Sequence, residues 1–288
     1  MTALKKRISL IVGLLLVTIG TIHAQNFQGI ATYQSSRNMK NMQIKAEGVT
    51  EAMQKQLMEQ MKKQFQREYE LQFNLTESSW KEEESLDSGP ATASSGGMRI
   101  SFSTAGGGTT YKNTSENLYI QETTVFSKPF LVKDELQAYE WQMTDETKTI
   151  GNYTAYKAVY KDIRESRSIS FTSDSDDKDK DSGESTVVMD TISVSAWYTP
   201  EIPVSQGPED YWGLPGLILE LSDGSTTYLC TKVVLNPEEE IKIKRPSKGK
   251  KVTREELRVE MDSKMEEMSK KFKQGGKGGA TFRIGGDQ

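Results

Sequence analysis

The sequence predicts a mainly β (α+β) fold, in which a large curved antiparallel sheet or half-barrel carries two amphipathic helices packed on it. Short segments that alternate apolar and polar side chains recur along most of the chain, which is typical of half-buried antiparallel strands. Two longer segments instead repeat apolar side chains at helical spacing. About 260 residues would remain after removal of a leader, enough to bury one core without covalent cross-links.

The expected strands follow one another with turn-forming residues between them. The first is Phe27 to Tyr33, and the later ones span residues 69–75, 98–103, 117–126, 141–143, 155–163, 187–198, 217–221 and 226–235. Between the last two, Asp223-Gly224 indicates a tight hairpin turn, because Asp-Gly tolerates the backbone angles that such turns require.

Both expected helices have a methionine-rich apolar stripe. Residues 50–68 carry Met53, Leu57, Met61 and Phe65, and residues 253–273 carry Leu257, Met261, Met265, Met268 and Phe272. The second helix begins with Thr253-Arg254-Glu255-Glu256, which is a capping box. The stripes indicate packing against a sheet. An adaptable hydrophobic binding face, or Cu(I) bound by thioethers, are the alternatives.

The first residues have the layout of a secretory signal peptide. Three basic residues precede an apolar run from Ile8 to Ile19, and small residues end at Ala24. The run is shorter than the roughly 20 residues that a membrane-spanning helix needs. We therefore expect a signal peptide at 1–24, a single domain at 25–274 and a disordered glycine-rich tail at 275–288. The protein is expected in the periplasm or at the cell surface, with no transmembrane segment in its mature part.

Composition excludes several kinds of chemistry. Without residues 1–24 the chain keeps 34 basic residues against 41 acidic ones, a balance that disfavours nucleic acid. The one histidine, His23, lies in the signal peptide, so histidine-based catalysis and imidazole-bound zinc are excluded. The one cysteine, Cys230, stands in a strand and is expected to be buried and structural. We expect neither a metal nor a cofactor.

An acidic loop, Asp174 to Asp181, is the one segment that suggests calcium. Counted from Asp177, an EF-hand needs glycine at its sixth position and glutamate at its twelfth, where this chain has Ser182 and Val188. Lysines alternate with the aspartates. The pattern favours a solvated loop between strands.

Residues 196–221 are rich in proline, glycine and large aromatic side chains. Within them, Gly213-Leu214-Pro215-Gly216-Leu217-Ile218 is similar to the signature of the GLPGLI family of exported proteins from Bacteroidetes-type bacteria. Trp197-Tyr198-Thr199, Ile202-Pro203 and Gly207-Pro208 also resemble that family's pattern, in the expected order. The resemblance implies an envelope location and a β-rich fold, and it implies no activity. Members often carry a cysteine where Ala155 stands here.

The signature has two interpretations. In the first, it is a stiff corner that sets the angle of the strand at 217–221, with aromatic side chains covering the core. In the second, it is a preorganised recognition loop that contacts a ligand or partner. The candidate recognition residues are Trp197, Tyr198, Tyr211, Trp212, Leu214 and Pro215.

A curved sheet covered by helices favours a non-catalytic envelope protein that binds a hydrophobic small molecule or an envelope protein partner. The alternatives are a structural subunit of an outer-membrane assembly and a carboxylate-dependent hydrolase. The hydrolase hypothesis depends on four acidic residues near the signature, Glu201, Glu209, Asp210 and Glu220. We expect no catalytic residue outside that alternative.

Overall fold

The computed structural model describes residues 27–38, 50–83, 91–95, 98–102, 108–169 and 185–274. The expected signal peptide, acidic loop and glycine-rich tail lie outside these residues. In chain order the elements are β1 (Gln28–Arg37), α2 (Glu51–Gln64), β2 (Glu68–Asn74), β3 (Glu77–Glu82), β4 (Ala91–Ser95), β5 (Met98–Phe102), β6 (Thr109–Asn113), β7 (Leu118–Val125), β8 (Lys128–Glu135), β9 (Gln142–Ile150), β10 (Tyr153–Ile169), β11 (Ser185–Thr199), β12 (Leu217–Ser222), β13 (Thr226–Leu235), β14 (Lys250–Val252) and α3 (Arg254–Gln274).

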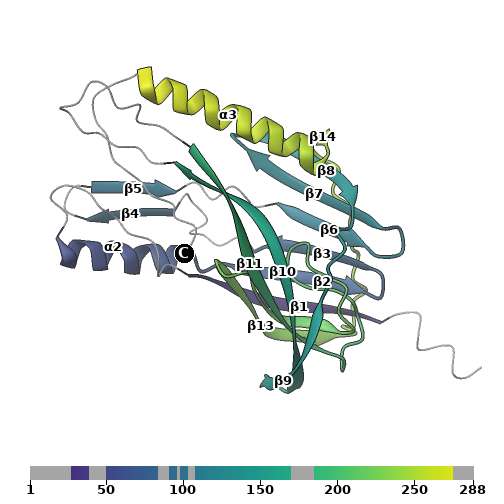
Figure 1. Ribbon diagram of the computed structural model, residues 1–288. Helices are drawn as coiled ribbons and strands as arrows, with labels where there is room; N and C mark the ends of the chain where they lie inside the picture. Colours follow the sequence, from purple (N-terminus) through teal and green to yellow (C-terminus); the bar gives the residue numbers. More distant parts are fainter. Residues whose placement is uncertain are drawn as a thin grey trace, which may run out of the picture.

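One sheet of 12 strands makes up most of the fold, in the order β14-β8-β7-β6-β3-β2-β1-β13-β12-β11-β10-β9 (Figure 1). Strands β14 and β9 are both edges, so the sheet is open. Neighbours pair antiparallel, except that β14 pairs parallel with β8. The mainly β expectation is thus confirmed, whereas the expected purely antiparallel sheet is wrong at this edge. Strands β4 and β5 form a separate two-stranded sheet.

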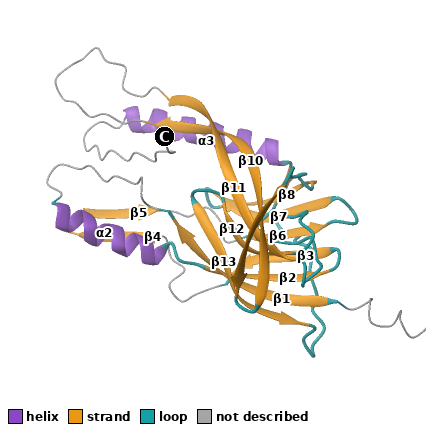
Figure 2. Cartoon of the chain, turned by 60° about the horizontal axis from the view of Figure 1, so that its bottom comes forward, coloured by secondary structure: helices purple, strands orange, loops and turns teal. Residues whose placement is uncertain are grey.

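The large sheet curves so that its two halves share one core. Strands β10 and β11 run steeply across the row formed by β1–β3 and β6–β8 in both views (Figures 1 and 2). The main core joins Tyr33, Phe73 and Trp80 from one half to Ala196 and Leu219 from the other. Bulges in β1 and between β11 and β12 add local bending. We call the side facing this core the core face, and the opposite side the outer face.

The two expected helices are present, and α3 lies on the large sheet, where it contacts β8 and β14. Helix α2 contacts β4 of the small sheet instead, so the expectation of two helices on one sheet is wrong (Figure 2). The predicted capping box starts α3: Thr253 N–H donates to Glu256 Oε2 at 2.8 Å, and Glu256 N–H donates to Thr253 Oγ1 at 3.1 Å. Neither described helix has the length and apolar character needed to cross a membrane.

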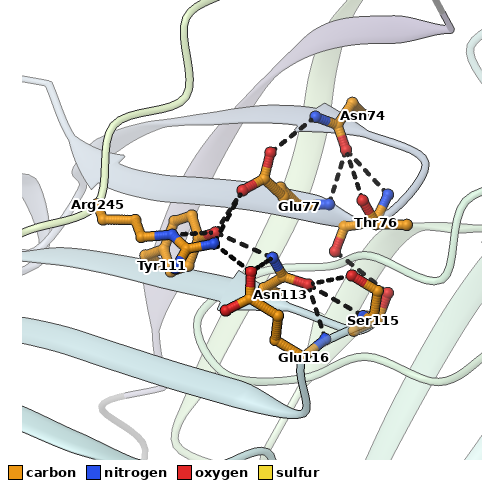
Figure 3. Close-up of polar contacts among 9 residues, drawn as sticks. Asn74, Thr76, Glu77, Tyr111, Asn113, Ser115, Glu116 and Arg245 are labelled. Atoms are coloured by element: carbon orange, nitrogen blue, oxygen red, sulfur yellow. Dashed lines mark hydrogen bonds and ion pairs between the residues drawn. The ribbon is translucent and has the colours of Figure 1, made fainter. Parts of the chain in front are cut away.

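Residues 236–249, which we call the strap, connect β13 to β14 across the outer face. Ile241 N–H donates to the side chain of Gln28 at 3.0 Å, and Ile243 packs on Tyr111 and its apolar neighbours. Arg245 Nε donates to Tyr111 Oη at 3.0 Å (Figure 3). The strap carries the chain from the middle of the sheet to its far edge, where β14 pairs parallel with β8.

The two glutamates that pair with Arg245 lie in two similar turns. In one, Asn74 Oδ1 accepts the N–H groups of Thr76 and Glu77; in the other, Asn113 Oδ1 accepts those of Ser115 and Glu116 (Figure 3). Both turns therefore have the sequence Asn-x-x-Glu, with the asparagine satisfying the turn's backbone donors. The guanidinium of Arg245 lies between the two glutamates and pairs with both.

Candidate functional site: a carboxylate and aromatic cleft on the core face

Residues 200–216, which we call the signature segment, fold back over the core face. Leu217 N–H donates to Ile202 O at 3.0 Å, and Ile218 N–H donates to Gln206 O at 3.1 Å, so the segment follows the start of β12. Its apolar side chains Ile202, Val204 and Leu214 are buried in the main core. The segment is therefore a packed part of the fold, because its burial and backbone bonds fix it along its length.

The glycines of the signature have structural roles. A Cβ atom on Gly216 would lie 2.1 Å from the carbonyl oxygen of Thr199, so only glycine lets β12 approach β11 this closely. Gly213 has a φ angle of 95°, which side-chain-bearing residues rarely adopt. Both observations place the turn into β12 under tight steric control.

Buried side chains of β3 and β6 hold the middle of the segment. Lys112 Nζ donates to Gly207 O and to Tyr211 O, both at 2.8 Å. Ser78 Oγ donates to Gln206 Oε1 at 2.7 Å. Burial lowers the pKa of Lys112 to about 7, although the nearby Asp210 and Glu209 carboxylates act in the opposite direction.

The acidic residues Glu209 and Asp210 lie, along the chain, between Gly207 and Tyr211, whose carbonyl groups bind Lys112. Glu209 has a φ angle of 51°, a left-handed conformation that glutamate rarely adopts. Its Oε1 accepts a hydrogen bond from the Tyr228 hydroxyl, and Asp210 accepts one from the Tyr139 hydroxyl. Burial, and then the adjacent carboxylate, raises the pKa of both tyrosines far above its ordinary value. Both hydroxyls therefore stay protonated and act as donors.

A first space with a volume of about 450 Å³ opens beside Glu209 and Asp210. Its remaining lining residues are Ser35, Arg37, Phe65, Arg67, Tyr69, Trp80, Glu82, Gly108, Thr110, Tyr119, Gln121, Thr226 and Tyr228. The rings of Tyr69 and Trp80 are stacked, with centroids 4.8 Å apart. Arg67 Nε lies 3.4 Å from Glu82 Oε1 on the same wall. The wall thus combines aromatic rings with paired charges of opposite sign.

A second space of about 380 Å³ adjoins the first, because Tyr119, Gln121 and Asp210 line both. Arg254, the first residue of α3, lies over the Tyr119 ring at 3.9 Å from its centroid. Its Nη2 is 3.7 Å from Asp210 Oδ2 and is buried without a hydrogen bond to the described residues. We call the two spaces together the cleft, with Asp210 and Arg254 at their junction.

The candidate recognition residues of the signature do not gather in one place. Tyr198 and Leu214 are buried in the core, while Tyr211 is buried and lines the second space. Trp197 lies on the outer face with Lys148 Nζ 4.2 Å from its ring centroid. Trp212 Nε1 donates to Gln137 O at 2.7 Å, and Pro215 is exposed.

The four acidic residues near the signature are also separated. Glu209 and Asp210 line the cleft, whereas Glu220 pairs with Lys148 at 2.6 Å and Glu201 accepts the N–H of Thr154 at 2.9 Å. Only the adjacent pair is placed to meet a ligand in the cleft.

Sequence reasoning missed the partners that complete the cleft, which are Trp80, Lys112, Tyr119, Tyr228 and Arg254. Arg254 was identified only as part of a capping box. The sequence pattern gave no signal for Lys112, because the Thr109–Asn113 segment does not alternate apolar and polar side chains.

Comparison with known proteins gives a family of unknown function and distant structural similarity. Residues 141–220 match the sequence profile of a family described as "Protein of unknown function (Porph_ging)". This stretch includes Glu209 and Asp210, whereas the other charged and aromatic residues of the first space lie outside it. No curated protein is similar enough to this chain to be counted as a relative.

Two solved structures share a distant resemblance with this chain. They are described as "Structure of PNGF-II in C2 space group" and "Structure of PNGF-II in P21 space group", and are 15% and 16% identical to it. Each similarity covers 82% of this chain, with a TM-score of 0.44. The chain spans about a third of the length of those chains, since 32% and 33% of them are covered.

Proposed function

We propose that this chain is a non-catalytic binding protein that holds a small polar ligand in the cleft. The observation that carries the proposal is the fixed placement of Glu209 and Asp210. Buried Lys112 binds the backbone on either side of this pair, and a tyrosine hydroxyl orients each carboxylate. Preorganised polar groups bind a ligand without the entropic cost of ordering them first.

The cleft supports a polar ligand more strongly than the hydrophobic one expected from the sequence. An apolar ligand would leave the charged groups of Glu209, Asp210 and Arg254 desolvated without new partners, which costs free energy. On the same walls the ring of Tyr69 is half-buried and offers apolar contact area beside these groups, whereas Trp80, Tyr119 and Tyr228 are no more than 6% exposed. Small-molecule sites commonly combine such surfaces in spaces of about 300–1,000 Å³.

A carboxylate-dependent hydrolase is the second candidate, favoured by two neighbouring carboxylates in a polar cleft. A glycosidase of this kind needs one carboxyl group that carries a proton for the leaving group. Here Glu209 and Asp210 each accept a hydrogen bond from a tyrosine hydroxyl, which orients both groups as a binding site requires and assigns neither of them as the proton donor. The binding role therefore has the better support.

We further propose that the chain is an exported member of the GLPGLI family. The six signature residues, the ordered motifs before them and the profile match over residues 141–220 support membership. The basic, apolar and small-residue layout of residues 1–24 supports export to the periplasm or cell surface.

The experiment is native mass spectrometry of the chain purified gently from its exported compartment, followed by denaturation to release bound molecules. We expect a polar compound that the wild type retains and the double variant Glu209→Asn/Asp210→Asn loses. Asparagine suits position 209 because it tolerates a left-handed backbone. The matched control is Glu239→Gln/Glu240→Gln, two exposed carboxylates on the strap. A lipid that survives the cleft substitutions would contradict the proposal.

A further inference from the structure

Resting on the proposed function, we infer that the ligand of the cleft is a neutral oligosaccharide. Three features of the cleft lead to this class: charges of opposite sign stand side by side, aromatic rings line the same space, and two spaces adjoin. None of the three depends on the others.

The charge pattern disfavours charged ligands. At the junction of the two spaces, Arg254 Nη2 lies 3.7 Å from Asp210 Oδ2, so a ligand cation drawn to Asp210 meets Arg254, and a ligand anion drawn to Arg254 meets Asp210. A hydroxyl group avoids this conflict, because it donates to the carboxylate and accepts from the guanidinium. The buried Nη2 of Arg254, which has no hydrogen bond to the described residues, is a donor that such a hydroxyl would satisfy.

The same pattern recurs inside the first space. Arg67 and Glu82 form an ion pair on its wall with side chains that are 14% and 23% exposed. A ligand there again meets a donor beside an acceptor. Hydroxyl groups spaced along a chain would engage both pairs, whereas a single charged group would engage at most one.

Aromatic side chains complete the match. Tyr69, Trp80, Tyr119 and Tyr228 all line the first space, and Tyr119 continues into the second. Tyr69 is half-buried and offers the most ring surface, since the other three are no more than 6% exposed. Sugar rings present C–H faces between their hydroxyl groups, and such faces pack on aromatic rings. The two spaces of about 450 and 380 Å³ adjoin, so they suit a linear ligand of more than one ring.

The experiment is ¹⁹F NMR of the full chain labelled with 5-fluorotryptophan, which gives one signal for each of its four tryptophans. Trp80 lines the cleft and reports binding, and Trp197 on the outer face is the internal control. The probes are three trisaccharides: neutral chitotriose, its cationic deacetylated form, and anionic trigalacturonate. Cellotriose and maltotriose extend the neutral set.

We expect a neutral trisaccharide to shift the Trp80 signal and leave the Trp197 signal in place. Its affinity should change less than about twofold between about 0.05 M and 0.5 M salt. Asp210→Asn and Arg254→Gln should each weaken binding about tenfold or more, while Glu239→Gln/Glu240→Gln should not. An unchanged Trp197 signal verifies that each variant is folded.

Two results would overturn the inference: tighter, salt-sensitive binding of a charged trisaccharide, or no Trp80 shift with any neutral one. If a non-sugar polar compound from the native mass spectrum shifts Trp80, the oligosaccharide inference fails and the proposed function stands. If nothing released from the protein shifts Trp80, both fail.

Discussion

The hydroxyl of Tyr228 on β13 donates a hydrogen bond to Glu209 on the signature segment. The contact joins β13 to the signature segment, which precedes β12. It is made at Glu209, whose backbone is left-handed. A conformation of this kind costs of the order of 1–3 kcal/mol and persists only where surrounding contacts hold it. The Tyr228 hydrogen bond and the two Lys112 bonds are such contacts.

Tyr228→Phe removes the hydroxyl and leaves the ring in place. We expect a loss of about 1–2 kcal/mol in the free energy of unfolding, because Glu209 loses a donor in a largely buried setting. Urea denaturation followed by tryptophan fluorescence measures it. Tyr156→Phe, on a more exposed tyrosine, is the control and should change stability by less than about 0.5 kcal/mol. Equal effects in both variants would show that the Glu209 contact adds nothing.

Lys112→Met should change how stability depends on pH. The pKa of Lys112 is about 7 in the folded chain, against about 10.4 for an ordinary lysine. Between these values the unfolded chain binds more protons, so this group makes stability rise with pH. The rise is complete above about pH 10.4 and absent below about pH 7.

Urea denaturation at several pH values between about 7 and 9.5 tests this, because the window lies between the two Lys112 pKa values. We expect the wild type to gain stability relative to Lys112→Met as pH rises. Lys133→Met, on an exposed lysine, should run parallel to the wild type. Parallel curves for the wild type and Lys112→Met would mean that Lys112 titrates normally in the folded chain.

Gly216→Ala tests the steric role of the signature. The added methyl group would lie 2.1 Å from the Thr199 carbonyl oxygen and 2.8 Å from the Pro200 nitrogen, so β11 and β12 would have to separate. We expect a loss of about 2 kcal/mol or more, measured by denaturant unfolding. Pro215→Ala, at the exposed neighbouring position, should be much milder. A fully stable Gly216→Ala chain would refute the close approach.

Arg245→Gln should loosen the strap without changing the cleft. Arg245 joins the strap to Tyr111 and to the two Asn-x-x-Glu turns, so its loss should speed amide exchange at residues 236–249, including the Ile241 N–H. Hydrogen–deuterium exchange with mass spectrometry measures this. Lys244→Gln, on an exposed neighbouring side chain, is the control. Unchanged exchange in the strap would show that Ile243 and the backbone contacts hold it without Arg245.

The repeating strands were predictable, because their buried positions alternate as sequence reasoning requires. The Asp223-Gly224 turn lies between β12 and β13 as expected, and Cys230 is buried in β13 as expected. Strands β3, β4, β6, β8 and β14 were not among the expected segments, and β3 and β6 were missed for a physical reason. Their inward-facing Ser78 and Lys112 are polar, so the segments do not alternate like half-buried strands.

The cleft was harder to predict than the fold. Ser78 and Lys112 bind acceptors that are 128 and 95 residues away along the chain, at Gln206 and Gly207. Local pattern cannot supply contacts of this range. Of the two interpretations of the signature, the recognition loop required Tyr211 and Leu214 to be exposed, yet both are buried. The adjacent Glu209 and Asp210 line the cleft instead.

The most direct test of the central claim is a crystal structure of the chain purified from its exported compartment and grown with the compound it retains. The binding account predicts ordered ligand density in the cleft, with polar ligand atoms within hydrogen-bonding distance of Asp210 and Arg254. A ligand bound on the outer face or at the edge strand β9, with the cleft filled only by water, would contradict it.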